Sequence, residues 1–202
     1  GEFGALSPEQ VAALDRAERS AQQLTEVVNG HVDLGPPVAS RIPVERQEVS
    51  VDTLLRELEV ETASLERPDN VRITFRTSGR NELPWLSTDP MKVKVILRNL
   101  IENALHATTR GEVTIEARPA ADGVEIVVSD TGVGISPERV PELFESFEIE
   151  NPLARASTAG LGIGLYVVRR LLEILGGRIE ASSSPGQGST FRVFLPLSAA
   201  RA

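Results

Sequence analysis

A helical repeat of apolar residues between Asp89 and Leu105 constrains the fold of this chain more than any other feature of its sequence. The apolar positions recur at three- and four-residue steps and are Val93, Ile96, Leu97, Leu100, Ile101 and Leu105. This spacing is typical of one face of an α-helix, and Asp89-Pro90 is a favourable helix start. Because such a face must be buried against another layer, the helix is expected to form part of a core.

Alternating runs flank this helix and indicate strands. Residues 112–118 and 124–129 alternate polar and apolar side chains around a turn, as do 178–183 and 189–197, which predicts two hairpins. The other predicted elements are a strand over 45–51, a helix from its N-cap Asp52 to Leu65, a strand over 71–77, and a helix over 162–175 ended by Gly176-Gly177. This order of elements predicts an α+β fold.

The bulk composition excludes several classes of protein. The 202 residues are 41% hydrophobic and 25% charged, as in an ordinary globular domain, and carry a net charge of −8. Such a charge offers no general attraction to nucleic acid or to anionic membranes. The chain has no cysteine, which agrees with a cytoplasmic setting. No apolar run reaches the roughly 20 residues that span a bilayer, so we expect no membrane contact here, although a parent protein could be membrane-anchored.

The sequence of the amino-terminal region predicts a separate helix. Residues 1–3 resemble a cloning remnant, and Ser7-Pro8 is a strong helix start. The stripe that follows comprises Val11, Leu14, Ala17, Ala21, Leu24 and Val28. The helix, within residues 4–34, either packs on its own domain or serves as a dimerisation helix outside it. A proline-rich linker over 35–44 separates it from the rest.

Two asparagines mark the polar face of the long helix. Asn99 and Asn103 are four residues apart and therefore lie on one helical face, which His106 joins. An amide oxygen can ligate Mg²⁺ beside a polyphosphate without adding negative charge. The alternative is a pair of solvated or capping amides. Glu102 lies off this face and is either a surface charge or a base that polarises water.

A second candidate follows the strand over 124–129. In Asp130-Thr131-Gly132-Val133-Gly134-Ile135, the glycines permit close approach of a ligand, and the Asp130 carboxylate could accept a hydrogen bond from an exocyclic amine such as that of adenine. An ordinary turn uses the same residue types.

The third candidate enters the helix over 162–175 and comprises Gly160, Leu161, Gly162, Ile163, Gly164 and Leu165. Free amides at a helix start, with glycines that leave room, favour phosphate. The run lacks the Lys-Ser/Thr of a P-loop and the preceding strand of a Rossmann motif. Residues 148–159 before it are polar and aperiodic, as expected of a lid, and Phe144 and Phe147 would anchor its near end.

Taken in order, these segments resemble the N, G1, F and G2 boxes of sensor histidine kinases, over about residues 45–197. The resemblance implies a Bergerat ATP-binding fold, a two-layer α/β sandwich in which a mixed sheet packs on helices, over residues 45–198. It implies ATP and Mg²⁺ as cofactors. It also implies that Asn103 is the metal ligand and that Asn99 and His106 lie near the phosphates. At the adenine amine it implies Asp130, with four residues around it: Gly132, Gly134, Ile135 and Thr190. Phe147 and the glycine run would belong to the lid.

The same resemblance bears on the reaction. ATPases of this superfamily have a glutamate base where this chain has Asn99, which favours phosphotransfer over hydrolysis. The acceptor motif of histidine kinases is absent, and His31 reads as a helix-end residue. The helix within 4–34 would then be a second dimerisation helix. We expect nucleotide binding without autophosphorylation, with partners in an acceptor-histidine helix, a response-regulator receiver domain and a second subunit. Alternatives are a serine-directed or dehydrogenase-type kinase of the same fold, or an inactive nucleotide-binding or dimerisation scaffold.

Overall fold

The computed structural model describes residues 43–63, 65, 67–78, 83–144 and 161–198. The chain divides into two units, Gly1–Pro43 and Val44–Ala202, and the described residues belong almost entirely to the second. The predicted helix within 4–34, most of the linker, the lid, Phe147 and Gly160 lie outside the described residues. In the described part of the chain, no helix is both long enough and apolar enough to cross a membrane.

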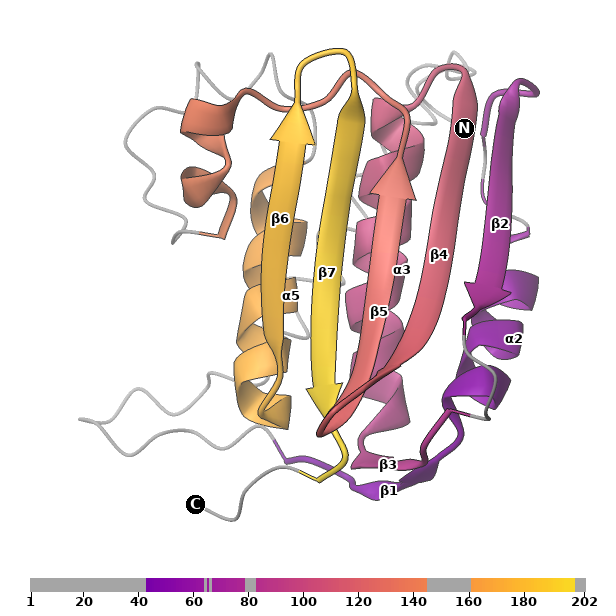
Figure 1. Cartoon of the computed structure of the whole chain (residues 1–202), viewed down its shortest axis with the longest axis vertical. Coiled ribbons are helices and arrows are strands. Elements are labelled where there is room, and N and C mark those ends of the chain that lie inside the picture. Colours follow the sequence, from indigo (N-terminus) through magenta and orange to yellow (C-terminus); the bar gives the residue numbers. More distant parts are fainter. Residues whose placement is uncertain (1–42, 64, 66, 79–82, 145–160, 199–202) are drawn as a thin grey trace, which may run out of the picture. The chain divides into compact units, whose positions relative to one another are not determined.

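A five-stranded mixed sheet forms one layer of the second unit (Figure 1). Its strands, in spatial order, are β2 (Val71–Thr77), β4 (Gly111–Ala120), β5 (Gly123–Asp130), β7 (Gly188–Pro196) and β6 (Arg178–Ser184). The β2 and β4 strands are parallel, and the other neighbours are antiparallel. Both predicted hairpins, β4–β5 and β6–β7, are therefore confirmed.

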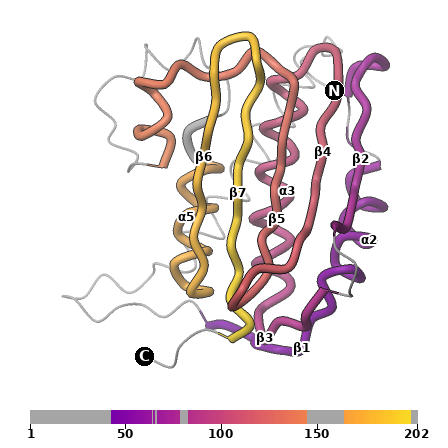
Figure 2. The backbone as a smooth tube through the Cα atoms, in the orientation of Figure 1, coloured from indigo at the N-terminus to yellow at the C-terminus, as the bar shows by residue number. Residues whose placement is uncertain are grey.

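Helices cover one face of this sheet, as the backbone tube in Figure 2 also shows. They are α2 (Val51–Thr62), α3 (Pro90–Ala107) and α5 (Leu161–Leu175). The apolar stripe of α3 is buried against the sheet, together with side chains that include Leu58, Ile115, Ile126, Leu172 and Val193. The two-layer α+β sandwich predicted from the sequence is thus present. The α5 helix ends before Gly176, whose φ of 77° suits glycine at a helix end.

The helix starts follow their capping residues, with one correction. The α2 helix is capped by Ser50, whose Oγ accepts a hydrogen bond from Thr53 N, so the prediction that Asp52 caps it is wrong and Asp52 lies in its first turn. The Ser50 hydroxyl, one residue before the helix, reaches the backbone amide of Thr53, the third residue of the helix. Asp52 lies inside the helix and therefore cannot cap it.

The α3 helix begins at Pro90 after its cap Asp89. The Asp89 carboxylate accepts hydrogen bonds from Lys92 N and Glu45 N. It also forms an ion pair with Lys92 Nζ at 2.6 Å. Burial alone would raise the pKa of this carboxyl, but these bonds to its charged form outweigh burial and hold the pKa below its ordinary value. Asp89 therefore ties the start of α3 to the start of the domain.

A short two-stranded sheet lies at one end of the domain. It pairs β1 (Gln47–Val49) antiparallel with β3 (Leu86–Thr88), which the sequence did not predict as a strand. The predicted strand over 45–51 is accordingly reduced to three residues. Ser87 N donates to Leu197 O, so β3 also joins the end of β7. Two 3₁₀ turns, η1 (Pro137–Arg139) and η2 (Pro141–Phe144), follow β5.

Candidate functional site

In the amide pair of α3, Asn99 is buried and Asn103 is half-buried. Asn99 is only 6% exposed, and its Nδ2 donates to Val95 O at 2.8 Å. Asn103, one turn further on, carries the one buried side-chain nitrogen or oxygen that lacks a hydrogen-bond partner among the described residues. A buried unpaired donor costs about 1–3 kcal/mol. The Asn103 amide is therefore a group that a ligand could satisfy.

The start of α5 lies directly against this pair. A β-carbon at Gly164 would stand 2.8 Å from Asn99 Oδ1 and 3.9 Å from Asn103 Nδ2. The glycine at this position thus lets two helices that are far apart in sequence meet at the amides. Leu165, the next residue, is fully buried in the core and holds the α5 start in place. The structure brings together the asparagine face and the carboxyl end of the glycine run.

Asp130 ends β5 and is buried, at 6% exposed. Its Oδ1 accepts a hydrogen bond from Gly132 N at 2.8 Å. Burial raises the pKa of the Asp130 carboxyl above its ordinary value, and hydrogen bonds from Gly132 and from the backbone and side chain of Ser189 offset only part of that rise. The carboxylate is accordingly a buried acceptor, and its donors are the backbone amides of Gly132 and Ser189 and the Ser189 hydroxyl.

The turn after Asp130 rests on the carboxyl end of α3. Val133 N donates to Ala107 O at 3.1 Å, and a β-carbon at Gly132 would lie 2.3 Å from that same oxygen. Gly134 has a φ of 68° and faces the β6–β7 turn, where any side chain would meet Ser184 O. Ala107 follows Asn103 by one helical turn. The α3 helix therefore carries the asparagine motif and contacts both glycine motifs.

The hydroxyl near Asp130 belongs to Ser189, whereas the resemblance implied Thr190 beside the adenine amine. Side chains alternate along β7, so Ser189 is buried on the helix face and Thr190 lies on the opposite face, where its Oγ1 is 3.1 Å from Ser129 Oγ. Ser189 Oγ in turn lies 3.0 Å from Ser183 Oγ of β6, which accepts from Ile135 N at 2.8 Å. Neither Ser183 nor Ser189 was identified from the sequence.

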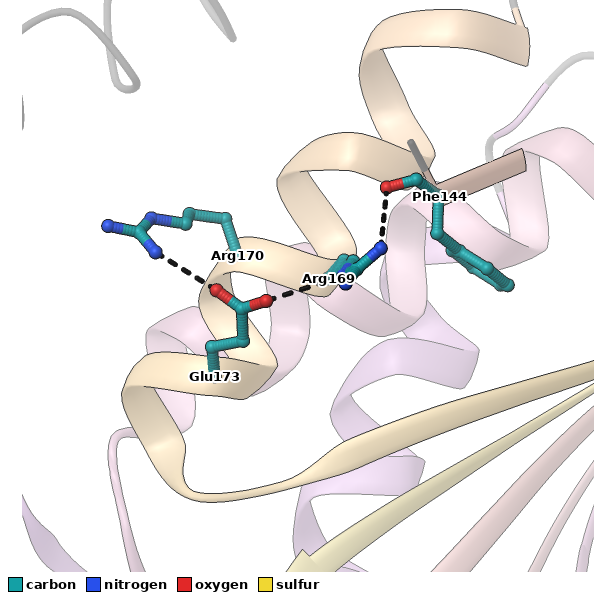
Figure 3. Close-up of polar contacts among 4 residues, drawn as sticks. All are labelled: Phe144, Arg169, Arg170 and Glu173. Carbon is teal, nitrogen blue, oxygen red and sulfur yellow. Dashed lines mark hydrogen bonds and ion pairs between the residues drawn. The ribbon is translucent and has the colours of Figure 1, made fainter. Parts of the chain in front are cut away.

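Two of the expected residues have no hydrogen bond to this cluster in the described part of the chain. Glu102 pairs with Arg98 on the same helix, with Nε to Oε1 at 2.9 Å. His106 is exposed in the last turn of α3 and makes no hydrogen bond or ion pair with the residues that the structure describes. Phe144 contacts Phe191 of β7 edge to face, with ring centroids 6.4 Å apart, and therefore anchors η2 to the sheet. Figure 3 shows that Arg169 of α5 also holds η2, since its Nη1 donates to Phe144 O at 3.2 Å.

Comparisons with known proteins agree with this arrangement. A family model described as histidine kinase-, DNA gyrase B- and HSP90-like ATPase matches residues 88–199, more than half of the chain. The sensor protein GacS of Pseudomonas syringae pv. syringae is 32% identical over 207 residues, which cover 97% of this chain and 22% of GacS. The chain thus spans about a fifth of the length of that relative.

Solved structures show the same likeness. The crystal structure of full-length ShkA in complex with AMPPNP matches with a TM-score of 0.71 and 27% identity, over 100% of this chain and 42% of that one. The nucleotide-free catalytic domain of the histidine kinase ThkA matches with a TM-score of 0.64 and 27% identity, over 76% of this chain and 97% of that one. The chain belongs to the histidine kinase-, DNA gyrase B- and HSP90-like ATPase family, and it contains the ATP-binding catalytic domain of a sensor histidine kinase.

Proposed function

We propose that this domain binds ATP with Mg²⁺ between α3, the turn after Asp130 and the start of α5, and transfers the γ-phosphoryl group to a histidine outside the chain. The phosphoryl group would then pass to an aspartate of a response regulator. The observation that carries the proposal is the close approach of Gly164 to Asn99 and Asn103, beside the buried Asn103 Nδ2, a donor that has no partner in the described residues and suits a phosphate oxygen.

The amide pair suits a triphosphate and its metal ion. Asn103 and Asn99 are neutral, so they can face anionic phosphates without repulsion, and an amide oxygen is an acceptable Mg²⁺ ligand. The described residues hold no cluster of three or more His, Cys, Asp or Glu side chains that could bind a metal alone. By the resemblance to sensor histidine kinases, the Asn103 amide oxygen would hold magnesium together with the nucleotide. Bound Mg-ATP supplies an activated phosphoryl group whose charge the metal partly neutralises.

Asp130 suits the adenine end. A carboxylate offers about four lone-pair sites, and three donors from Gly132 and Ser189 already approach this one. The remaining site can accept the exocyclic amine of adenine. We infer that Ser189 contributes the hydroxyl at this end in place of Thr190, while Gly132, Gly134 and Ile135 would border the base.

Transfer to an imidazole fits this site better than hydrolysis does. Hydrolysis needs a base to activate water, whereas an imidazole brings its own lone pair. Glu102 is the only carboxylate within α3, and it is ion-paired with Arg98. Asn99 occupies the position at which ATPases of the superfamily place their glutamate. The ShkA complex with AMPPNP is a further reason to expect a triphosphate here.

The test is calorimetric titration of the protein with ATP in the presence of Mg²⁺. The wild type should bind, Asn103→Ala should lose affinity by about tenfold or more, and Asn70→Ala, a change at an exposed asparagine before β2, should have no effect. Absence of ATP binding by the wild type, or equal affinity of wild type and Asn103→Ala, would overturn the assignment.

A second experiment identifies the acceptor. The protein is mixed with labelled ATP and a separate fragment that carries the histidine-bearing helix of the parent kinase. Acid-labile label on that fragment supports histidine kinase activity, whereas acid-stable label on serine would select a serine-directed kinase of the same fold. Binding of ATP without transfer to any fragment would favour a nucleotide-binding scaffold.

A further inference from the structure

The hydroxyl of Ser183 connects three segments that surround Asp130. Its Oγ accepts from Ile135 N at 2.8 Å, donates to Gly188 O at 2.8 Å, and lies 3.0 Å from Ser189 Oγ. Ile135 belongs to the turn that follows Asp130, and the other two residues open β7. One side chain of β6 therefore donates to Gly188 O and accepts from Ile135 N, which leaves one lone pair that can accept a hydrogen from Ser189.

Ser189 links this hydroxyl to the carboxylate. Both its backbone amide and its side chain bond to Asp130, and the side chain also contacts Ser183. A serine hydroxyl has a single hydrogen, so Ser189 can donate either to Asp130 or to Ser183 at any moment. Ser183 therefore competes with Asp130 for the hydroxyl hydrogen of Ser189.

Other contacts keep the same segments together without Ser183. Gly186 N donates to Val133 O at 2.7 Å, and Val133 N donates to Ala107 O at 3.1 Å. The turn after Asp130 thus remains attached to the β6–β7 turn and to α3 when the Ser183 hydroxyl is removed. What is lost is the fixed position of Ile135 N, in the turn that follows Asp130, and the orientation of Ser189, which bonds to Asp130.

We propose that Ser183 is a positioning residue for nucleobase recognition: its hydroxyl aligns Ser189 and the Ile135 amide so that Asp130 presents its remaining acceptor to the amine of adenine. This inference rests on the proposed binding of ATP at Asp130. Ser183 touches no part of the nucleotide in this scheme and acts through its neighbours.

The experiment compares ATP with purine riboside 5′-triphosphate, which lacks only the exocyclic amine. Their affinity ratio, measured by calorimetry, isolates the contact between the amine and Asp130. Ser183→Ala should lower this ratio by about threefold or more, since a single hydrogen bond contributes up to roughly tenfold in affinity. Ser183→Thr, which keeps the hydroxyl on a β-branched side chain suited to a strand, should restore it.

Ser182→Ala is the matched control, because Ser182 is the preceding residue on the opposite face of β6, where its Oγ accepts from Arg192. The amide proton of Ile135 should also exchange faster in Ser183→Ala than in either other variant. An unchanged ratio in Ser183→Ala, or equal weakening of both nucleotides, would overturn the inference. If the wild type bound neither nucleotide, the proposed function itself would fail, which is a different result from binding that ignores Ser183.

Discussion

Gly164 of α5 and Asn99 of α3 are so close that a β-carbon on the glycine would lie 2.8 Å from Asn99 Oδ1. Asn99 cannot move without cost, because it is buried and its Nδ2 is bonded to Val95 O. The glycine therefore sets the position of the amide face as well as leaving room beside it.

Gly164→Ala should separate stability from binding. Alanine favours a helix by about 1 kcal/mol over glycine, which offsets the displacement of the Asn99 amide, so the melting temperature should change little. The ATP affinity should fall by about tenfold because both amides shift. Calorimetry and thermal unfolding check the two parts, with Arg170→Ala on the exposed face of α5 as a control. Unchanged ATP affinity would contradict the close packing at this point.

Asn103→Leu should stabilise the domain and abolish its response to ATP. The buried Asn103 Nδ2 has no partner in the described residues, and an apolar side chain of similar size removes that penalty of about 1–3 kcal/mol. Without nucleotide, urea unfolding should give a free energy of unfolding about 1 kcal/mol above that of the wild type.

Wild-type protein should gain about 2.7 kcal/mol when ATP is present at 100 times its Kd, and Asn103→Leu should gain nothing. Asn70→Ala should behave as the wild type in both respects. A less stable Asn103→Leu without nucleotide would mean that the amide has a structural role that the described contacts do not include.

The long elements could be predicted from the sequence, and the short ones could not. The apolar stripe of α3 and the alternation in β4 to β7 are repeated over many residues, so burial leaves a clear periodic signal. By contrast, β3 is three residues long and exists because Ser87 pairs with Glu48 and bonds to Leu197. Contacts so distant in sequence leave no local pattern.

The candidate site was predicted in outline, and its hydroxyls were missed. Asn99, Asn103, Asp130 and Gly164 stand in recognisable motifs, whereas Ser183 and Ser189 read as ordinary hairpin residues. A signal for Ser189 was nevertheless present. Phe191, Val193 and Leu195 mark the buried face of β7, and a period of two puts Ser189 on that face and Thr190 on the other.

Ser189→Ala and Thr190→Ala provide a direct comparison of adjacent residues on opposite faces. Ser189→Ala removes a hydroxyl that bonds to Asp130, so the ATP affinity should fall by about threefold to tenfold. Thr190→Ala removes a contact with Ser129 on the far face and should leave the ATP affinity unchanged. The reverse order of effects in calorimetry would return the adenine contact to Thr190.

The buried carboxyl of Asp130 should make stability depend on pH. Its pKa is raised by burial, so the folded protein holds this proton more tightly than the unfolded chain does. The stabilisation is complete below the unfolded pKa, near 3.8, and is lost as the pH rises through the folded pKa. Asp130→Asn stays neutral, so relative to the wild type it should gain stability as the pH rises through that window. Urea unfolding between pH 4 and pH 7 checks this, with Asp122→Asn at the exposed β4–β5 turn as control.

The same carboxyl should make adenine recognition depend on pH in the opposite direction. Only the ionised form of Asp130 has all its oxygen lone pairs available as acceptors, so the preference for ATP over purine riboside 5′-triphosphate should decline on acidification through its raised pKa. The two nucleotides share the same triphosphate, and their ratio therefore cancels the titration of the phosphates and of the metal. Asp130→Asn should show little preference at any pH, because its amide directs a donor toward the amine, whereas Asp122→Asn should follow the wild type. A preference that stayed constant as the pH fell from 7 to 4 in the wild type would show that a group other than the Asp130 carboxylate recognises the amine.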